Sequence, residues 1–131
     1  MTYRDLMNGA IAAVCEDASS AGVEDYQTRA PFLLATFVTQ YAKLDDNYRA
    51  ANGMENKVIS TDAAAIDLED DFPLCDIFAP AAINHLASGL VIDENEEMSD
   101  KFFDRYINII LEIRENIPAK MESIIDRYNL T

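Results

Sequence analysis

The chain of 131 residues is poor in basic side chains: 10 Lys and Arg accompany 24 Asp and Glu, and the formal net charge is -14. Nucleic-acid and anionic membrane surfaces are bound through Lys and Arg, so this balance disfavours both partners. No stretch approaches the roughly 18 apolar residues of a membrane span, and the first residues do not resemble a signal peptide. The two cysteines, Cys15 and Cys75, lie among apolar neighbours, as reduced thiols do. We therefore expect a cytoplasmic protein that does not bind membranes.

The residues of common catalytic and metal sites are also scarce. His85 is the single histidine, and it lies roughly 15 Å along a predicted helix from Cys75, too far for a nucleophile–base pair. The four glycines are isolated and form no phosphate-binding loop. Residues 93–99 alternate like the start of a calcium loop, but Met98 and Asp104 stand where that loop needs glycine and glutamate. We expect no enzymatic activity, no cofactor and no bound metal.

Half of the residues are apolar or aromatic (50%), and their spacing predicts a mainly α fold. We expect one domain over residues 1–131, a small bundle of four to five helices. The predicted helices span about 3–20, 28–52, 75–92, a stretch ending at 116, and 119–128. The second of these carries the most aromatic residues, which predicts that it is the central helix of the core.

Local signals predict where these helices begin and end. Thr2 and Asp5 resemble a capping box for the first helix, with Asp in place of Glu. Pro31 is expected in the first turn of the second helix, and a kink or break is expected near Asp45–Asp46. Ser99, or the acids before it, is expected to cap the fourth helix.

The helical period disappears between Gly53 and Pro73. Residues 57–60 and 65–68 are short enough to be the arms of a β-hairpin between the second and third helices. The connection between them contains no glycine, so an irregular loop is the alternative.

The fourth helix carries more apolar residues than one buried face needs. A first stripe consists of Phe102, Tyr106, Ile109, Ile110, Ile113 and Ile117. A second stripe consists of Phe103, Ile107 and Leu111. Because a helix wet on one side needs only one stripe, the second predicts either central burial or an interface with a partner.

Acidic residues gather in the middle of the chain, where Lys57 and Lys101 enclose eleven Asp and Glu and no base. We expect an acidic surface that includes Asp70, Asp71, Asp93, Glu94, Glu96 and Glu97. Such a surface can simply aid solubility, can imitate DNA phosphates to block a nucleic-acid enzyme, or can line a channel through which DNA slides.

One stretch resembles a known family. The run Phe72-Pro73-Leu74, the alanine-rich segment 79–90, the acidic turn 93–96 and the aromatic segment 102–106 are together similar to the second half of tailed-phage head–tail connector (adaptor) proteins. Residues 26–44 would correspond to the family's earlier long helix. The resemblance covers most of residues 26–116, and the segment after Pro118 has no counterpart in it.

The resemblance implies a non-enzymatic virion-assembly protein, made in the cytoplasm and carried in the virion. It implies a homo-oligomeric ring beneath the portal, in contact with portal and neck or tail proteins. DNA would pass through this ring without specific binding, because a negative wall repels phosphates. The alternatives are an acidic DNA mimic that inhibits or regulates a nucleic-acid enzyme, and a plain helical protein-interaction module.

Overall fold

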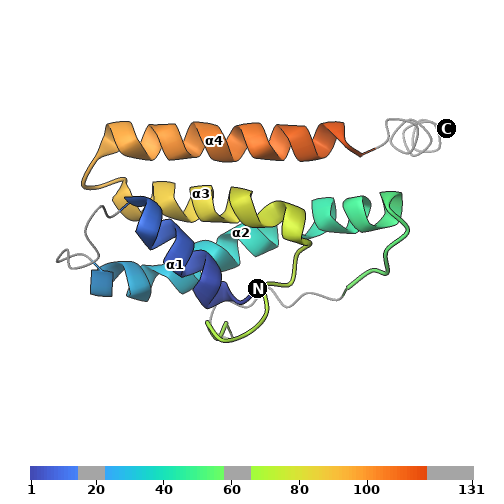
Figure 1. The fold of residues 1–131 in the computed structure, drawn as a ribbon, viewed down its shortest axis with the longest axis horizontal. Coiled ribbons are helices and arrows are strands. Elements are labelled where there is room, and N and C mark those ends of the chain that lie inside the picture. Colours follow the sequence, from blue (N-terminus) through green and yellow to red (C-terminus); the bar gives the residue numbers. More distant parts are fainter. Residues whose placement is uncertain (15–22, 58–65, 118–131) are drawn as a thin grey trace.

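The computed structural model describes residues 1–14, 23–57 and 66–117, which form a mainly helical fold as predicted. Its elements are α1 (Tyr3–Val14), α2 (Val23–Ala51), a 3-10 turn η2 (Asp76–Phe78), α3 (Ala79–Val91) and α4 (Glu96–Glu115). Figure 1 shows α4 lying along one side of α3, with α1 and α2 crossing on its other side. Buried side chains from all four α-helices form one hydrophobic cluster. None of the helices in the described residues is long and apolar enough to cross a membrane.

The predicted β-hairpin is not supported, because the described residues contain no strand. Residues 58–60 and 65 of its two arms lie outside these residues, and so does the helix predicted over 119–128. The described residues show one isolated antiparallel bridge, between Thr2 and Asp71. Beside it, the Phe72 N–H donates to the Met1 carbonyl at 2.8 Å, so the segment before η2 is bound to the start of α1.

Helix α1 begins with the predicted capping box. The Thr2 N–H donates to Asp5 Oδ2 at 2.9 Å, and the Asp5 N–H donates to Thr2 Oγ1 at 3.2 Å. Hydrogen bonds with the backbone and hydroxyl of Thr2 hold the pKa of the Asp5 carboxyl below its usual value. The predicted continuation of this helix over residues 15–20 lies outside the described residues. The buried face of α1 consists of Tyr3, Leu6, Met7 and Ala10.

Helix α2 begins at Val23, earlier than the predicted start near Thr28. Glu24 and Asp25 occupy its first turn, where negative charge is favourable at the positive end of the helix dipole. Pro31 therefore lies inside the helix rather than in its first turn, so that prediction is wrong. A proline in this position leaves the carbonyl four residues earlier without its helical donor.

The expected break near Asp45–Asp46 is also wrong, because α2 continues as one helix to Ala51. Asp45 lies on the buried face and binds Arg49 one turn later on the same helix, which ties the two turns together. Gly53, with φ of 68°, follows the end of α2 in the left-handed conformation that favours glycine.

The central helix is α3, not α2 as the aromatic content predicts. Helix α3 packs against α1, α2 and α4, and half of its buried residues are alanine. A Cβ added at Gly89 of α3 would lie 3.0 Å from Leu33 Cδ1 on α2, and one at Gly9 of α1 would lie 3.2 Å from Ile83 Cδ1 on α3. Small residues thus allow α1 and α2 to approach α3 closely, which the count of large side chains does not indicate.

Candidate protein interface on α4

Helix α4 is held at its start by two polar contacts. Asn95 is the N-cap, and its Oδ1 accepts a hydrogen bond from the Met98 N–H at 3.0 Å. The predicted cap, Ser99, is instead buried: its hydroxyl donates to the Ser88 carbonyl at 2.9 Å, and the Ser88 hydroxyl donates to the Ser99 carbonyl at 3.0 Å. The prediction of Ser99 as cap is wrong because this serine joins α4 to α3.

The first apolar stripe of α4 is packed into the core as expected. It consists of Phe102, Tyr106, Ile110 and Ile113, which are buried, Ile109, which is partly buried, and Ile117 just beyond the helix, which is buried. The Tyr106 hydroxyl forms a hydrogen bond with the Tyr41 hydroxyl of α2. Burial raises the pKa of Tyr106 well above its usual value, and this hydrogen bond adds to the effect. Helix α4 is therefore fixed to both α3 and α2.

The second stripe lies at the surface. Phe103 is 49% exposed and Leu111 is 51% exposed, whereas Ile107 between them is partly buried. Each follows a buried residue of the first stripe, so it points about 100° further round the helix. The Phe103 ring still contacts the buried Tyr106 ring, with 5.6 Å between the centroids. The second stripe is thus neither part of the core nor fully exposed to solvent. It lies beside the first stripe of the same helix, which is packed into the core.

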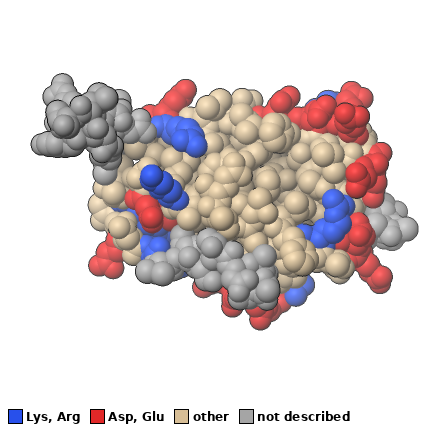
Figure 2. Space-filling model, turned by 180° about the vertical axis from the view of Figure 1, so that it is seen from behind, with Lys and Arg blue, Asp and Glu red and all other residues tan. Residues whose placement is uncertain are grey.

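Charged side chains are unevenly distributed over the surface. Figure 2 shows Lys, Arg, Asp and Glu gathered at the ends and edges of the face on which α2 lies, around a broad uncharged area. Residues 30–42 of α2 contain no charged side chain, and Phe32 among them is 63% exposed. This face therefore combines a periphery of mixed charge with the exposed Phe32.

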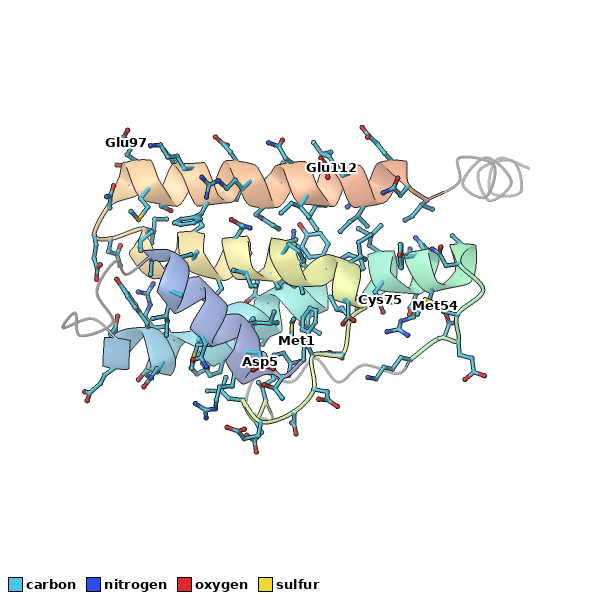
Figure 3. The ribbon with its side chains drawn as sticks, in the orientation of Figure 1. Met1, Asp5, Met54, Cys75, Glu97 and Glu112 are labelled. Carbon is cyan, nitrogen blue, oxygen red and sulfur yellow. The ribbon has the colours of Figure 1, made fainter. Side chains whose placement is uncertain are left out.

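The predicted acidic residues are all exposed but lie in two places. Asp70 and Asp71 precede η2, beside the start of the chain. The other group lies at the turn from α3 to α4 and consists of Asp93, Glu94, Glu96 and Glu97. Figure 3 shows Met1 and Glu97, which mark the two places, well apart. The structure does not bring the two groups together into one acidic strip.

A buried ion pair joins α2 to the segment before η2, and sequence analysis does not single it out. Asp45 is fully buried, and its carboxylate accepts hydrogen bonds from Arg49 Nε and from the Cys75 N–H, both at 2.8 Å. Arg49 Nη2 also donates to the Pro73 carbonyl at 3.2 Å. The available signal was an acid on the apolar face of a helix, four residues before an arginine.

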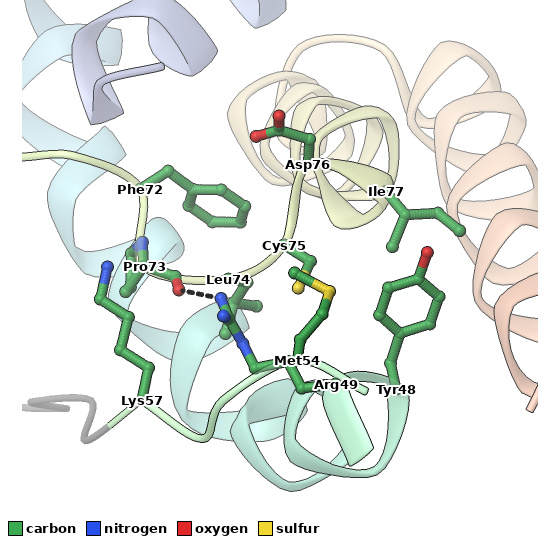
Figure 4. Close-up of a pocket in the computed structure, with 10 residues that line it drawn as sticks. All are labelled: Tyr48, Arg49, Met54, Lys57, Phe72, Pro73, Leu74, Cys75, Asp76 and Ile77. Carbon is green, nitrogen blue, oxygen red and sulfur yellow. Dashed lines mark hydrogen bonds between the residues drawn. The ribbon is translucent and has the colours of Figure 1, made fainter. Parts of the chain in front are cut away.

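Arg49 also lines an open pocket of about 380 Å³ between the end of α2 and η2, shown in Figure 4. Its wall includes Tyr48, Met54 and Cys75. Desolvation raises the pKa of the buried Cys75 thiol to about 11, and contact with the Asp45 carboxylate adds to the rise. This thiol is protonated at neutral pH and is therefore a poor nucleophile. Within this pocket, Arg49 binds the segment before η2 through the Pro73 carbonyl.

Within residues 1–14, 23–57 and 66–117, no three His, Cys, Asp or Glu side chains are grouped as ligands for a metal ion. Comparison of the chain with protein-family models, with curated proteins and with solved structures gives no match. The stripe formed by Phe103, Ile107 and Leu111 is our candidate functional surface, because two of its apolar side chains are half exposed.

His85 of α3 is a titratable side chain among buried aromatic rings. Its Nε2 is buried and has no hydrogen-bond partner among the residues that the structure describes. Its ring contacts the rings of Phe37 and Tyr106, with centroid separations of 5.6 and 5.0 Å. Desolvation lowers the pKa of His85 below 6.5, and a backbone hydrogen bond with Leu33 opposes part of this effect.

We expect protonation of His85 to favour the unfolded chain. The free energy of unfolding should be highest above about pH 6.5 and should fall as the pH drops from there towards the lower pKa of the folded state. Chemical denaturation at several pH values in this window measures the slope. Because this is the single histidine, His85→Phe should remove its contribution. An equal slope in wild type and variant would contradict the prediction.

Proposed function

We propose that this chain is a non-enzymatic assembly protein that binds other proteins through the exposed stripe of α4. The observation that carries the proposal is the half-exposed pair Phe103 and Leu111, on a helix whose other apolar face is already packed. Apolar side chains one and two helical turns apart are typical of helices that dock on a partner. Following the sequence resemblance, the assembly is a head–tail connector, a ring beneath a phage portal that also contacts neck or tail proteins.

One property of the described residues and one of the full sequence support this role. The Ser88–Ser99 and Tyr41–Tyr106 contacts fix α4 in the fold, so the stripe is ordered before a partner arrives and less entropy is lost on binding. The net charge of -14 suits a wall along which DNA slides, since negative side chains repel phosphates.

The acidic DNA mimic is the second candidate, and the exposed acids at the turn from α3 to α4 favour it. A mimic needs negative charges along one face at the spacing of phosphates. In this fold Asp70 and Asp71 lie apart from the acids of that turn, which weakens this candidate. A plain interaction module would use the α4 stripe in the same way as a connector, so its partners distinguish the two.

We expect Phe103→Asp with Leu111→Asp to abolish partner binding while the protein stays folded. Both side chains are half exposed, so the substitutions should alter the partner surface more than the core. Tagged wild type and variant are recovered from the native host lysate after prophage induction, and co-purified proteins are identified by mass spectrometry. Circular dichroism checks the fold of each variant.

The matched control is Ile92→Asp, which places a similar charge at another half-exposed apolar residue, at the end of α3. Portal, capsid or tail proteins bound by wild type and control, but lost from the double variant, would support the connector. A nuclease, polymerase or repressor released by salt would instead support the DNA mimic. A double variant that cannot fold would show that the stripe is part of the core.

A further inference from the structure

The exposed face of α4 is symmetric about Ile107. Phe103 and Leu111 lie four residues before and after it, and Asp100 and Arg114 lie seven residues before and after it. Successive residues are about 100° apart around a helix, so these four residues lie within about 40° of the direction in which Ile107 points. The face therefore has an apolar middle, a negative end at Asp100 and a positive end at Arg114.

The two charges at the ends of this face are available to a partner. Asp100 and Arg114 are both exposed, and neither forms an ion pair within the described part of the chain. By contrast, Lys101 lies well away from this face around the helix and approaches Glu97 to 3.9 Å. Asp100 and Arg114 thus flank the half-exposed apolar residues, at opposite ends of the same face.

We infer that a second copy of this chain docks on this face in antiparallel orientation, with a two-fold axis at Ile107. In this arrangement Asp100 of each copy faces Arg114 of the other, and Phe103 of each copy faces Leu111 of the other. A parallel pair in register would instead place Asp100 against Asp100 and Arg114 against Arg114, and such like-charge contacts are unfavourable. The face is therefore complementary in charge to a second copy of itself, and only in the antiparallel direction.

The apolar residues and the charges have different roles in this pair. Burial of Phe103, Ile107 and Leu111 supplies the affinity, whereas exposed ion pairs contribute little to it and mainly specify register. The contact is short, because Asp100 and Arg114 are about 21 Å apart by the helical rise. We therefore expect a reversible dimer whose population rises with protein concentration.

This inference rests on the proposed function in one respect, that the α4 stripe is a protein contact. A two-fold pair uses the same surface on both copies and closes on itself, so it does not extend into a ring. The pair is the form of the free chain, and it shields the stripe until an assembly partner takes the place of the second copy.

Sedimentation of the full chain at several concentrations tests the pair. Wild type should show a monomer–dimer equilibrium. Asp100→Arg and Arg114→Asp should each weaken dimerisation roughly tenfold, because each replaces two opposite-charge contacts with two like-charge contacts. The combined variant Asp100→Arg/Arg114→Asp should recover wild-type dimerisation. All these positions are exposed, so the variants should fold normally.

The control is Lys101→Asp/Glu112→Arg, which makes the same types of charge change on another side of α4 and should dimerise like wild type. The antiparallel pair would be overturned if wild type stays monomeric at every concentration. It would also be overturned if the single substitutions leave the dimer dissociation constant unchanged. In either case the proposed function stands if the binding of portal or tail proteins to this chain still depends on Phe103 and Leu111. Conversely, a charge-dependent dimer without such partners would support the pair and count against the connector.

Discussion

Replacement of Arg49 with alanine is expected to lower the free energy of unfolding by about 3–5 kcal/mol. The Asp45 carboxylate is fully buried, and Arg49 Nε at 2.8 Å is its cationic partner. Without the guanidinium, the carboxylate stays buried with an uncompensated charge, and the Pro73 carbonyl loses its donor as well. Removing one member of a buried pair therefore costs far more than the pair's net contribution to stability.

Urea denaturation of wild type and Arg49→Ala measures this loss. Lys101→Ala is the matched control, because Lys101 and Glu97 are also four residues apart in a helix but are both exposed. That control should change stability by at most about 0.5 kcal/mol. Equal effects of the two substitutions would show that the Asp45–Arg49 pair is not decisive for the fold.

Phe37→Ala is expected to destabilise the fold by about 3–5 kcal/mol. Phe37 is completely buried on α2, and its ring contacts those of Tyr41, Phe72, His85 and Tyr106. These neighbours come from α2, the segment before η2, α3 and α4, so truncation opens a cavity where four parts of the fold meet. The loss should include both the transfer of the ring and the cavity that remains.

Thermal and urea denaturation check this second prediction. Phe32→Ala provides the control, since Phe32 lies on the same helix and is 63% exposed. We expect that substitution to change stability by about 0.5 kcal/mol or less. If Phe37→Ala were equally mild, the packing of α2 against α4 through this ring would be wrong.

Features that depend on nearby residues could be predicted from the sequence. The Thr2–Asp5 capping box needs only four consecutive residues, and the structure confirms both of its hydrogen bonds. Periodicity identified the buried stripe of α4 and separated Phe103 and Leu111 from it. It left open whether the second stripe was core or surface, because that depends on which helices cover α4.

Features that depend on distant residues were missed. Aromatic side chains predict that α2 is the central helix. Helix α3 is central instead, because Gly89 and its alanines allow neighbouring helices to approach it closely. The acid–arginine spacing of Asp45 and Arg49 resembles an ordinary surface pair. Its buried role becomes clear only when the Cys75 N–H, from a segment remote in the sequence, is brought against the carboxylate.

The central position of α3 has a consequence for how the fold forms. Only residues 92–95 separate α3 from α4, so these two helices meet as a local hairpin with a small loop-closure cost. Helix α1 instead reaches α3 across most of the described sequence, and its contacts are the most non-local of the three that α3 makes. The helix that presents the stripe thus belongs to the part of the chain best suited to early assembly. A surface formed this early is exposed while the rest of the chain is still folding, and a second copy that covers it would also protect the folding chain against aggregation.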